Sequence, residues 1–340
     1  MQHTPRLCID GRAAKDFMSK GLVAQEVIDQ LVSAQGENEA SSDWIEKHRT
    51  VLLSHPSQVF SGQLKRFDTR KKIGSTPIDW IWNKQFVKKA NISLLHRFVP
   101  VDRAKGTLPL PVINTLLPAN DKLPFFLSKK GNQSYIVPST QDAVLLEKKY
   151  QIAPEQITVV QPAVRRYVHF MDRMKPAFEG WILILVGDSV DAEKVPKLKE
   201  VLTKRFPNIQ QKVMVLGNST NVSATHWMKL LQNTRLCVYL MSQPFDWATL
   251  ALETFYWDIP TIFSDKNHAM SDLLPHSPLA LSHFLVNQPG FEELKTLAQK
   301  SRDALFDRGV FDAFSLARQY REIYAQFSTS PSKEIASKTV

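Results

Sequence analysis

The stretch WILILVGD, from Trp181 to Asp188, decides the fold class. An apolar run that ends in Gly-Asp is typical of a strand that is buried on both faces and opens into a loop. The stretches KVMVLG (212–217), LCVYLM (236–241) and PTIFSD (260–265) follow it and have the same character. Segments of helical length and periodicity separate them. This alternation predicts βαβ units and a parallel sheet.

The first half of the chain shows the same alternation. Strand candidates are RLCID from Arg6, and further apolar runs that start at positions 50, 92, 111, 134 and 156. We expect helices at 22–32, 76–90, 140–150, 192–205, 223–232, 247–257, 291–307 and 311–327, with Ser139 or Thr140 as the cap of the third. The expected domains are 1–165 and 166–310, with a helix at 311–328 that returns to the first domain and a frayed tail at 329–340.

The composition fits two globular domains. The chain has 340 residues, of which 43% are hydrophobic and 22% charged, enough apolar surface for a normal core. The apolar run from Trp181 to Val186 is much shorter than the roughly 20 residues that cross a bilayer. The start, MQHTPRLCIDGR, lacks the features of a secretion signal, and Cys8 and Cys237 both lie in apolar runs, as reduced thiols do. We therefore expect a cytoplasmic protein.

The positive charge is concentrated in the first half. The net charge is +10, and residues 1–166 hold 24 Lys/Arg against 15 Asp/Glu. The densest stretch, QLKRFDTRKK (63–72), is either a solvated loop or a surface that meets something anionic, such as lipid headgroups or a phosphorylated acceptor. No nucleic-acid-binding motif accompanies it, so nucleic acid is not an expected partner.

Familiar catalytic motifs are absent from the sequence. It has no GxSxG, P-loop, HExxH or paired CxxC, which removes the usual support for a hydrolase elbow, a Walker-type NTPase or a zinc protease. His268 and His276 flank Asp272, but Pro275 interrupts that stretch. We expect no metal site and no tightly bound cofactor.

The order of the motifs resembles glycosyltransferase family 4, whose members have the GT-B fold. LVGDS, VLGN and CVYLMSQPFDWATLALETFYWDIPTIFSD follow one another as in the nucleotide-sugar domain of that family. In the first half, IDGR before GLVAQEVIDQL, and YIVPSTQDAVLLEKKYQIAPEQITVVQPAV, are similar to its acceptor-side domain. The resemblance covers most of residues 5–328. It implies two Rossmann-like α/β domains that face each other across a cleft.

The resemblance also implies a set of site residues. Glu253 falls on the second Glu of the E-x7-E motif and would bind a ribose diol. Phe245 replaces the first Glu, and Asp246, Trp247 and Ala248 replace the Gly-Phe-Gly that follows it. The nucleotide side would comprise Gly187, Gly217, Asn218, Phe245, Ala248, Thr249, Leu250 and Glu253.

The basic and acceptor-side positions match the family less closely. Arg173 aligns with the Arg that meets the donor's diphosphate, while Lys175 or Arg166 would replace a Lys whose position falls on Phe178. His96 is the nearest candidate for the acceptor-side His. Arg12 and Gly21 would lie near the acceptor.

The function that follows is sugar transfer from a UDP- or GDP-sugar to a cell-envelope glycan or a lipid-linked acceptor. The resemblance implies retention of configuration and no bound metal. The protein would be cytoplasmic, with peripheral contact at the inner membrane face as one interpretation. Two alternatives stay open: a glycosyltransferase-like binding or scaffold protein that has lost catalysis, and a nucleotide-sugar epimerase.

Overall fold

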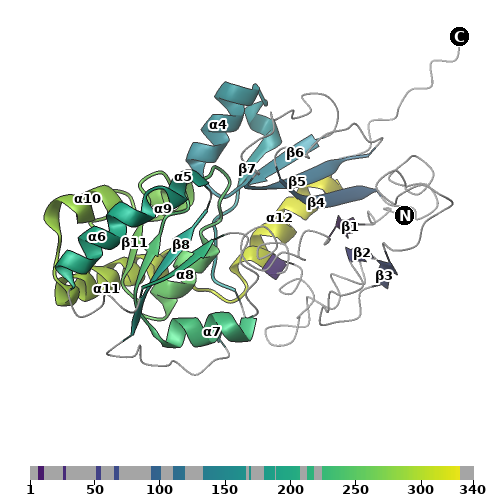
Figure 1. Ribbon diagram of the computed structural model, residues 1–340. Coiled ribbons are helices and arrows are strands. Elements are labelled where there is room, and N and C mark those ends of the chain that lie inside the picture. Colours follow the sequence, from purple (N-terminus) through teal and green to yellow (C-terminus); the bar gives the residue numbers. More distant parts are fainter. Residues whose placement is uncertain are drawn as a thin grey trace, which may run out of the picture.

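The computed structural model contains two parallel β-sheets in separate lobes (Figure 1). It describes residues 7–10, 26–27, 51–54, 65–68, 93–100, 110–118, 133–165, 168–169, 180–187, 189–206, 213–217 and 224–329. The first sheet has the strand order β3-β2-β1-β4-β5-β6-β7 and the second β11-β10-β8-β9. This confirms the expected α/β class with two parallel sheets.

The first sheet comprises β1 (Leu7–Asp10), β2 (Val51–Ser54), β3 (Lys65–Asp68), β4 (Leu94–Pro100), β5 (Val112–Leu117), β6 (Gln133–Val137) and β7 (Ile157–Val159). Strand β3 was not predicted, because its sequence KRFD has no apolar run. It lies at the edge of the sheet, where charged residues discourage pairing with another chain. The predicted helix at 76–90 lies outside the described residues.

Helix α4 (Thr140–Tyr150) follows β6. The Ser139 side chain accepts a hydrogen bond from the Asp142 backbone N–H, which confirms the predicted cap. Lys148 and Lys149 occupy the last turn, where their positive charges stabilise the negative end of the helix dipole. The short helix η4 (Pro154–Gln156) then leads into β7.

The second sheet comprises β8 (Trp181–Val186), β9 (Val213–Gly217), β10 (Thr234–Tyr239) and β11 (Thr261–Phe263). Its helices are α5 (Ser189–Ala192), α6 (Val195–Arg205), α7 (Ala224–Gln232), α8 (Thr249–Tyr256), α9 (His268–Leu273), α10 (Leu281–Asn287) and α11 (Phe291–Asp307). Helices α9 and α10 were not predicted, because their six and seven residues are too few to show a clear period.

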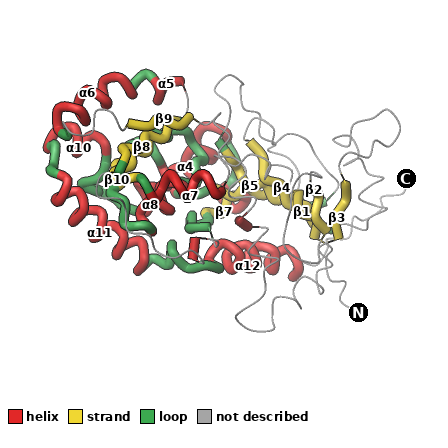
Figure 2. Tube along the Cα trace, turned by 60° about the horizontal axis from the view of Figure 1, so that its bottom comes forward, coloured by secondary structure: helices red, strands yellow, loops and turns green. Residues whose placement is uncertain are grey.

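Helix α12 (Ser315–Thr329) packs against the first sheet although it follows the second domain in sequence (Figures 1 and 2). Its buried side chains belong to a cluster with residues of β1, β4, β5 and β6. They are Leu316, Ala317, Tyr320, Ile323 and Tyr324. The last helix thus completes the core of the first domain.

Candidate functional site

The carboxyl ends of the second sheet's strands form one rim. The register pairs Val186 with Gly217 and Leu185 with Tyr239, and Tyr239 in turn with Phe263, so the four strands end at similar heights. Ligands of open parallel sheets bind beyond such an edge. Asp188 and Asn218, which follow Val186-Gly187 and Gly217, lie outside the described residues.

Close packing explains why position 187 is a glycine. A Cβ at this position would lie 3.1 Å from Asp191 Oδ2 and 3.3 Å from the Met241 Cα. The buried Asp191 carboxylate accepts hydrogen bonds from the Ser242 backbone N–H (3.1 Å) and hydroxyl (2.6 Å) and from Lys194 (2.7 Å). The glycine therefore lets the loop after β10 lie close to helix α5.

The loop after β10 reaches helix α8 through two left-handed residues. Phe245 has φ 64° and Ala248 has φ 51°, values that non-glycine residues adopt only where their surroundings hold them. Between them, Asp246 accepts hydrogen bonds from the Tyr239 hydroxyl (2.8 Å), the Asn267 amide (2.6 Å) and the Ala248 N–H (3.4 Å). Burial raises the pKa of Asp246 to about 6. The Asp246 carboxylate thus lies at the start of helix α8, where an anionic ligand would otherwise be favoured.

Phe245 and Trp247 do not face the second sheet's rim. Phe245 packs with first-domain residues including Leu116 and Tyr135, and Trp247 donates a hydrogen bond from Nε1 to the Leu116 carbonyl (3.0 Å). The expected contact of Phe245 with the nucleotide sugar stays a prediction, and it would require the buried side chain to leave this cluster. A large apolar side chain at a domain boundary gains more from entering an apolar core than from a polar cleft.

Glu253 is fully buried in an ion pair with Arg165. The guanidinium donates to both carboxylate oxygens, from Nε to Oε1 and from Nη2 to Oε2 (2.7 Å), and Trp227 Nε1 also donates to Oε2 (2.7 Å). This bidentate geometry is the strong form of such a pair. The expected ribose contact of Glu253 stays a prediction, and it now requires this ion pair to open.

The other expected residues of helix α8 are buried as well. Ala248 is inaccessible, and Thr249 and Leu250 are 7% and 2% exposed. Leu250 belongs to the core of the second domain. Gly217 is partly exposed at the end of β9. Of the expected nucleotide-side residues, Gly217 is thus the one that the described structure leaves accessible.

His96 lies in the interior of the first domain. Its Nδ1 is 2.6 Å from the Tyr324 hydroxyl and its Nε2 is 2.8 Å from the Thr115 hydroxyl, and burial lowers its pKa to about 3. An imidazole with both nitrogens engaged and no exposure cannot reach an acceptor in this arrangement. The acceptor-side role of His96 stays a prediction, and it would require this buried hydrogen-bonded arrangement to open. Arg12, Gly21, Arg173 and Lys175 lie outside the described residues.

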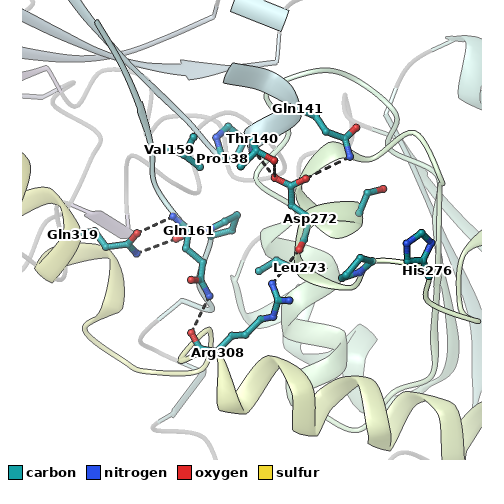
Figure 3. Close-up of a pocket in the computed structure, with 13 residues that line it drawn as sticks. Pro138, Thr140, Gln141, Val159, Gln161, Asp272, Leu273, His276, Arg308 and Gln319 are labelled. Carbon is teal, nitrogen blue, oxygen red and sulfur yellow. Dashed lines mark hydrogen bonds between the residues drawn. The ribbon is translucent and has the colours of Figure 1, made fainter. Parts of the chain in front are cut away.

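A hollow of about 800 Å³ lies between the two domains (Figure 3). At its centre, Asp272 Oδ2 accepts hydrogen bonds from the Thr140 N–H and hydroxyl, both at 2.5 Å, and the Asp272 carbonyl accepts one from Arg308 (3.1 Å). On the opposite wall, Gln161 and Gln319 exchange hydrogen bonds through Gln161 N–H (2.8 Å) and Gln161 carbonyl (3.1 Å). The hydrogen bonds from Thr140 to Asp272 therefore join the two domains across this hollow, whereas the Arg308–Asp272 and Gln161–Gln319 hydrogen bonds each lie within one domain.

Four residues that matter in the structure were not singled out as such from the sequence. Arg165 and Trp227 bind Glu253, and Asp142 accepts hydrogen bonds from His268 Nδ1 (2.7 Å) and from the Phe245 N–H (3.1 Å). From the sequence, His268 is a candidate only as a metal ligand. Within the described part of the chain, no group of three or more His, Cys, Asp or Glu could hold a metal ion.

Comparison with known proteins adds structural neighbours only. No protein-family model matches the sequence, and no similar curated protein was found. A glycosyltransferase from Rickettsia africae matches with a TM-score of 0.56 and 13% identity, over 97% of this chain and 100% of that one. Anabaena HepE, solved with UDP and glucose, matches with a TM-score of 0.58 and 11% identity, over 94% and 99%.

WaaG, a glycosyltransferase of lipopolysaccharide biosynthesis, matches with a TM-score of 0.53 and 10% identity, over 93% of this chain and 99% of that one. These matches cover 93–97% of this chain, so they extend over both domains. The chain has the GT-B fold. At such identities the likeness concerns the fold alone, and membership of family 4 stays a prediction. No helix in the described part of the GT-B chain is long and apolar enough to span a membrane.

Proposed function

We propose that this protein is a glycosyltransferase that takes its sugar from a nucleotide-sugar donor, UDP- or GDP-linked. The observation that carries the proposal is the match of nearly the whole chain, 93–97%, to three glycosyltransferases of complete GT-B architecture. HepE was solved with UDP and glucose, which supports a nucleotide sugar as the donor here.

The nucleotide would bind at the rim of the second sheet, beside Gly217 and the residues that follow β8 and β9. A rim of parallel strands offers backbone N–H groups to phosphates. The Asp246 carboxylate at the start of helix α8 disfavours a phosphate at that helix end by like charge. Asn218, Arg173 and Lys175 remain proposed contacts, the last two as cations that stabilise the departing diphosphate.

The test is a thermal-shift and calorimetric panel with UDP, GDP, ADP and their sugars. One nucleotide is expected to raise the melting temperature, since a ligand at 100 times its Kd adds roughly 2.7 kcal/mol of stability. Arg173→Gln should weaken that nucleotide's binding without changing the melting temperature of the free protein. Arg318→Gln, on helix α12 with a partly exposed ion pair to Asp312 (2.6 Å), is the matched control.

Two outcomes would redirect the proposal. Absence of binding by every nucleotide, with the protein folded, would favour the alternative of a GT-B binding or scaffold protein without catalysis. Binding followed by turnover without transfer to any saccharide would point away from glycan synthesis. Where transfer occurs, the anomeric configuration of the product, read by NMR, decides whether the reaction retains configuration as the family 4 resemblance implies.

The acceptor is proposed to be a cell-envelope glycan or a lipid-linked sugar, met at the inner membrane face. The support is the basic first half, including Lys65 and Arg66 on edge strand β3. Vesicles with acidic lipids should bind the protein, less so above about 0.15 M salt. Neutralising Lys65, Arg66, Lys71 and Lys72 should reduce binding more than neutralising four second-domain lysines, Lys197, Lys199, Lys204 and Lys229. Equal losses would discard the membrane contact.

A further inference from the structure

The loop between β10 and α8 anchors the second domain inside the first. Phe245 is 1% exposed and Trp247 is 2% exposed, although both belong to a connection of the second domain. Each belongs to a buried cluster whose other members are side chains of the first domain. The cluster of Phe245 comprises Leu116, Tyr135, Val137, Leu146 and Ile152; the cluster of Trp247 includes Ile9, Phe98, Ile113, Leu117 and Tyr320.

The two aromatic side chains enter different clusters on the first domain. Phe245 lies in the cluster beneath helix α4, and Trp247 lies in the cluster beneath helix α12. A hinge motion that separates the domains would have to withdraw both from apolar surroundings. It would also expose the Leu116 carbonyl, which Trp247 Nε1 now satisfies at 3.0 Å.

Polar contacts reinforce the same boundary. Asp142 at the start of helix α4 has no exposure, and it accepts hydrogen bonds from the Phe245 N–H (3.1 Å) and from His268 Nδ1 (2.7 Å). Asp272, which follows His268 by four positions on helix α9, accepts two hydrogen bonds from Thr140. Helices α4 and α9 are therefore joined by a carboxylate from each side.

The backbone of the loop is shaped for this contact. A phenylalanine with φ 64° is a true outlier for a bulky residue. It persists because Asp142 holds its N–H and the first-domain cluster holds its ring. The loop thus keeps an unfavourable backbone conformation at Phe245, where its side chain enters the first domain.

We propose that residues 243–248 together with helix α9 form a clamp that fixes the two domains in one relative orientation before any ligand binds. The ligand cleft is then preformed. The loop that the family resemblance places beside the donor sugar has a different task here, which is to hold the domains together. Sugar selection falls to other residues of the rim.

Pulsed EPR on the full chain tests this clamp directly. Spin labels at Lys148→Cys on helix α4 and Lys197→Cys on helix α6 report on the two domains, while Cys8 and Cys237 are buried. The expected result is a single narrow distance distribution without ligand that UDP, GDP and ADP leave unchanged. A broad or double distribution, or a shift with a nucleotide, would overturn the proposal.

The variant arm uses Phe245→Ala with Trp247→Ala, which should broaden the distribution. Phe284→Ala is the matched control, because Phe284 is equally buried but lies in the core of the second domain; it should lower the melting temperature and keep the distribution narrow. If the double variant does not fold, Asp142→Asn replaces it, with partial broadening expected. A distribution as narrow as that of the parent protein in a folded variant would contradict the clamp.

These measurements do not depend on catalysis. The unliganded protein alone can refute the clamp, and failure to bind any nucleotide would refute the proposed function while leaving the clamp intact.

Discussion

The polar groups inside each domain differ from those between the domains. Arg165 directly follows Val164, whose side chain belongs to the core of the second domain, as does helix α8 that carries Glu253. The side chains of Glu253 and Arg165 are 0% and 3% exposed, so the pair is sealed from water. Asp142 is equally buried, but its partner His268 is 25% exposed. Arginine stays protonated in proteins, whereas histidine changes charge near neutral pH. The charge of the Arg165–Glu253 pair is therefore fixed, whereas the charge of the Asp142–His268 pair between helices α4 and α9 can respond to pH.

The largest effect is expected from breaking the sealed pair. Arg165→Met leaves the Glu253 carboxylate buried and without its main partner, which should lower the free energy of unfolding by about 3–5 kcal/mol. Adding Glu253→Gln removes the orphaned charge and should recover a substantial part of that loss. Urea unfolding of the two variants measures both. A double variant as unstable as Arg165→Met alone would show that the pair does not act as a unit.

An exposed ion pair serves as the control for this experiment. Lys204 and Glu200 are 2.7 Å apart on helix α6, with side chains 74% and 63% exposed. Solvent screens such pairs, so Lys204→Met should change stability little. A comparable loss in both variants would mean that burial is not the deciding factor.

A second, smaller effect is the loss of stability at acid pH that comes from the buried His96. Burial lowers the pKa of His96 to about 3, below its value of about 6.5 in the unfolded chain. Its contribution to stability is therefore complete above pH 6.5 and is lost as the pH falls toward 3. Between pH 7.5 and pH 5 the loss should be about 2 kcal/mol. His96→Gln should reduce this acid dependence, as read from urea midpoints; an unchanged pH profile would contradict it.

The smallest effect has the opposite sign and belongs to the boundary. The hydrogen bond to Asp142 raises the pKa of His268, although partial burial opposes it. Because the folded value lies above the unfolded one, the stabilisation is complete below about pH 6.5 and is lost as the pH rises through the folded value. The EPR distribution should therefore broaden slightly at alkaline pH. Since His268→Gln removes the titrating group, its distribution should not change with pH, and an NMR titration of the parent should show the raised pKa.

Much of the fold could be predicted because its signals are local. The strands β8, β10 and β11 are apolar runs that stop at Gly, Ser or Asp, and helix α11 was predicted with the observed bounds, Phe291–Asp307. Ser139 was readable as a cap because capping needs only the next three residues. Strand β3 was missed because its place in the sheet depends on pairing with β2 and not on its own composition.

The candidate site was harder to predict because its contacts are between distant residues. Glu253 and Arg165 are separated by 88 positions, and Phe245 and Asp142 by 103. The sequence places Glu253 on a helix behind a strand end, but it does not say whether a ligand or an arginine meets the carboxylate. Similarly, the aromatic character of Phe245 and Trp247 is visible in the sequence, but the domain whose core they enter is not.

Because helix α12 completes the core of the first domain, that domain cannot finish folding until the end of the chain has been synthesised. The hydroxyls of Tyr320 and Tyr324 complete the hydrogen bonds of Thr115 (2.8 Å) and His96 (2.6 Å). These partners leave the ribosome more than 200 residues after the strands that they serve, since the separations are 205 and 228 positions. The domain that is translated first is thus the last to be finished, and a premature stop near residue 314 would damage the beginning of the molecule more than its middle.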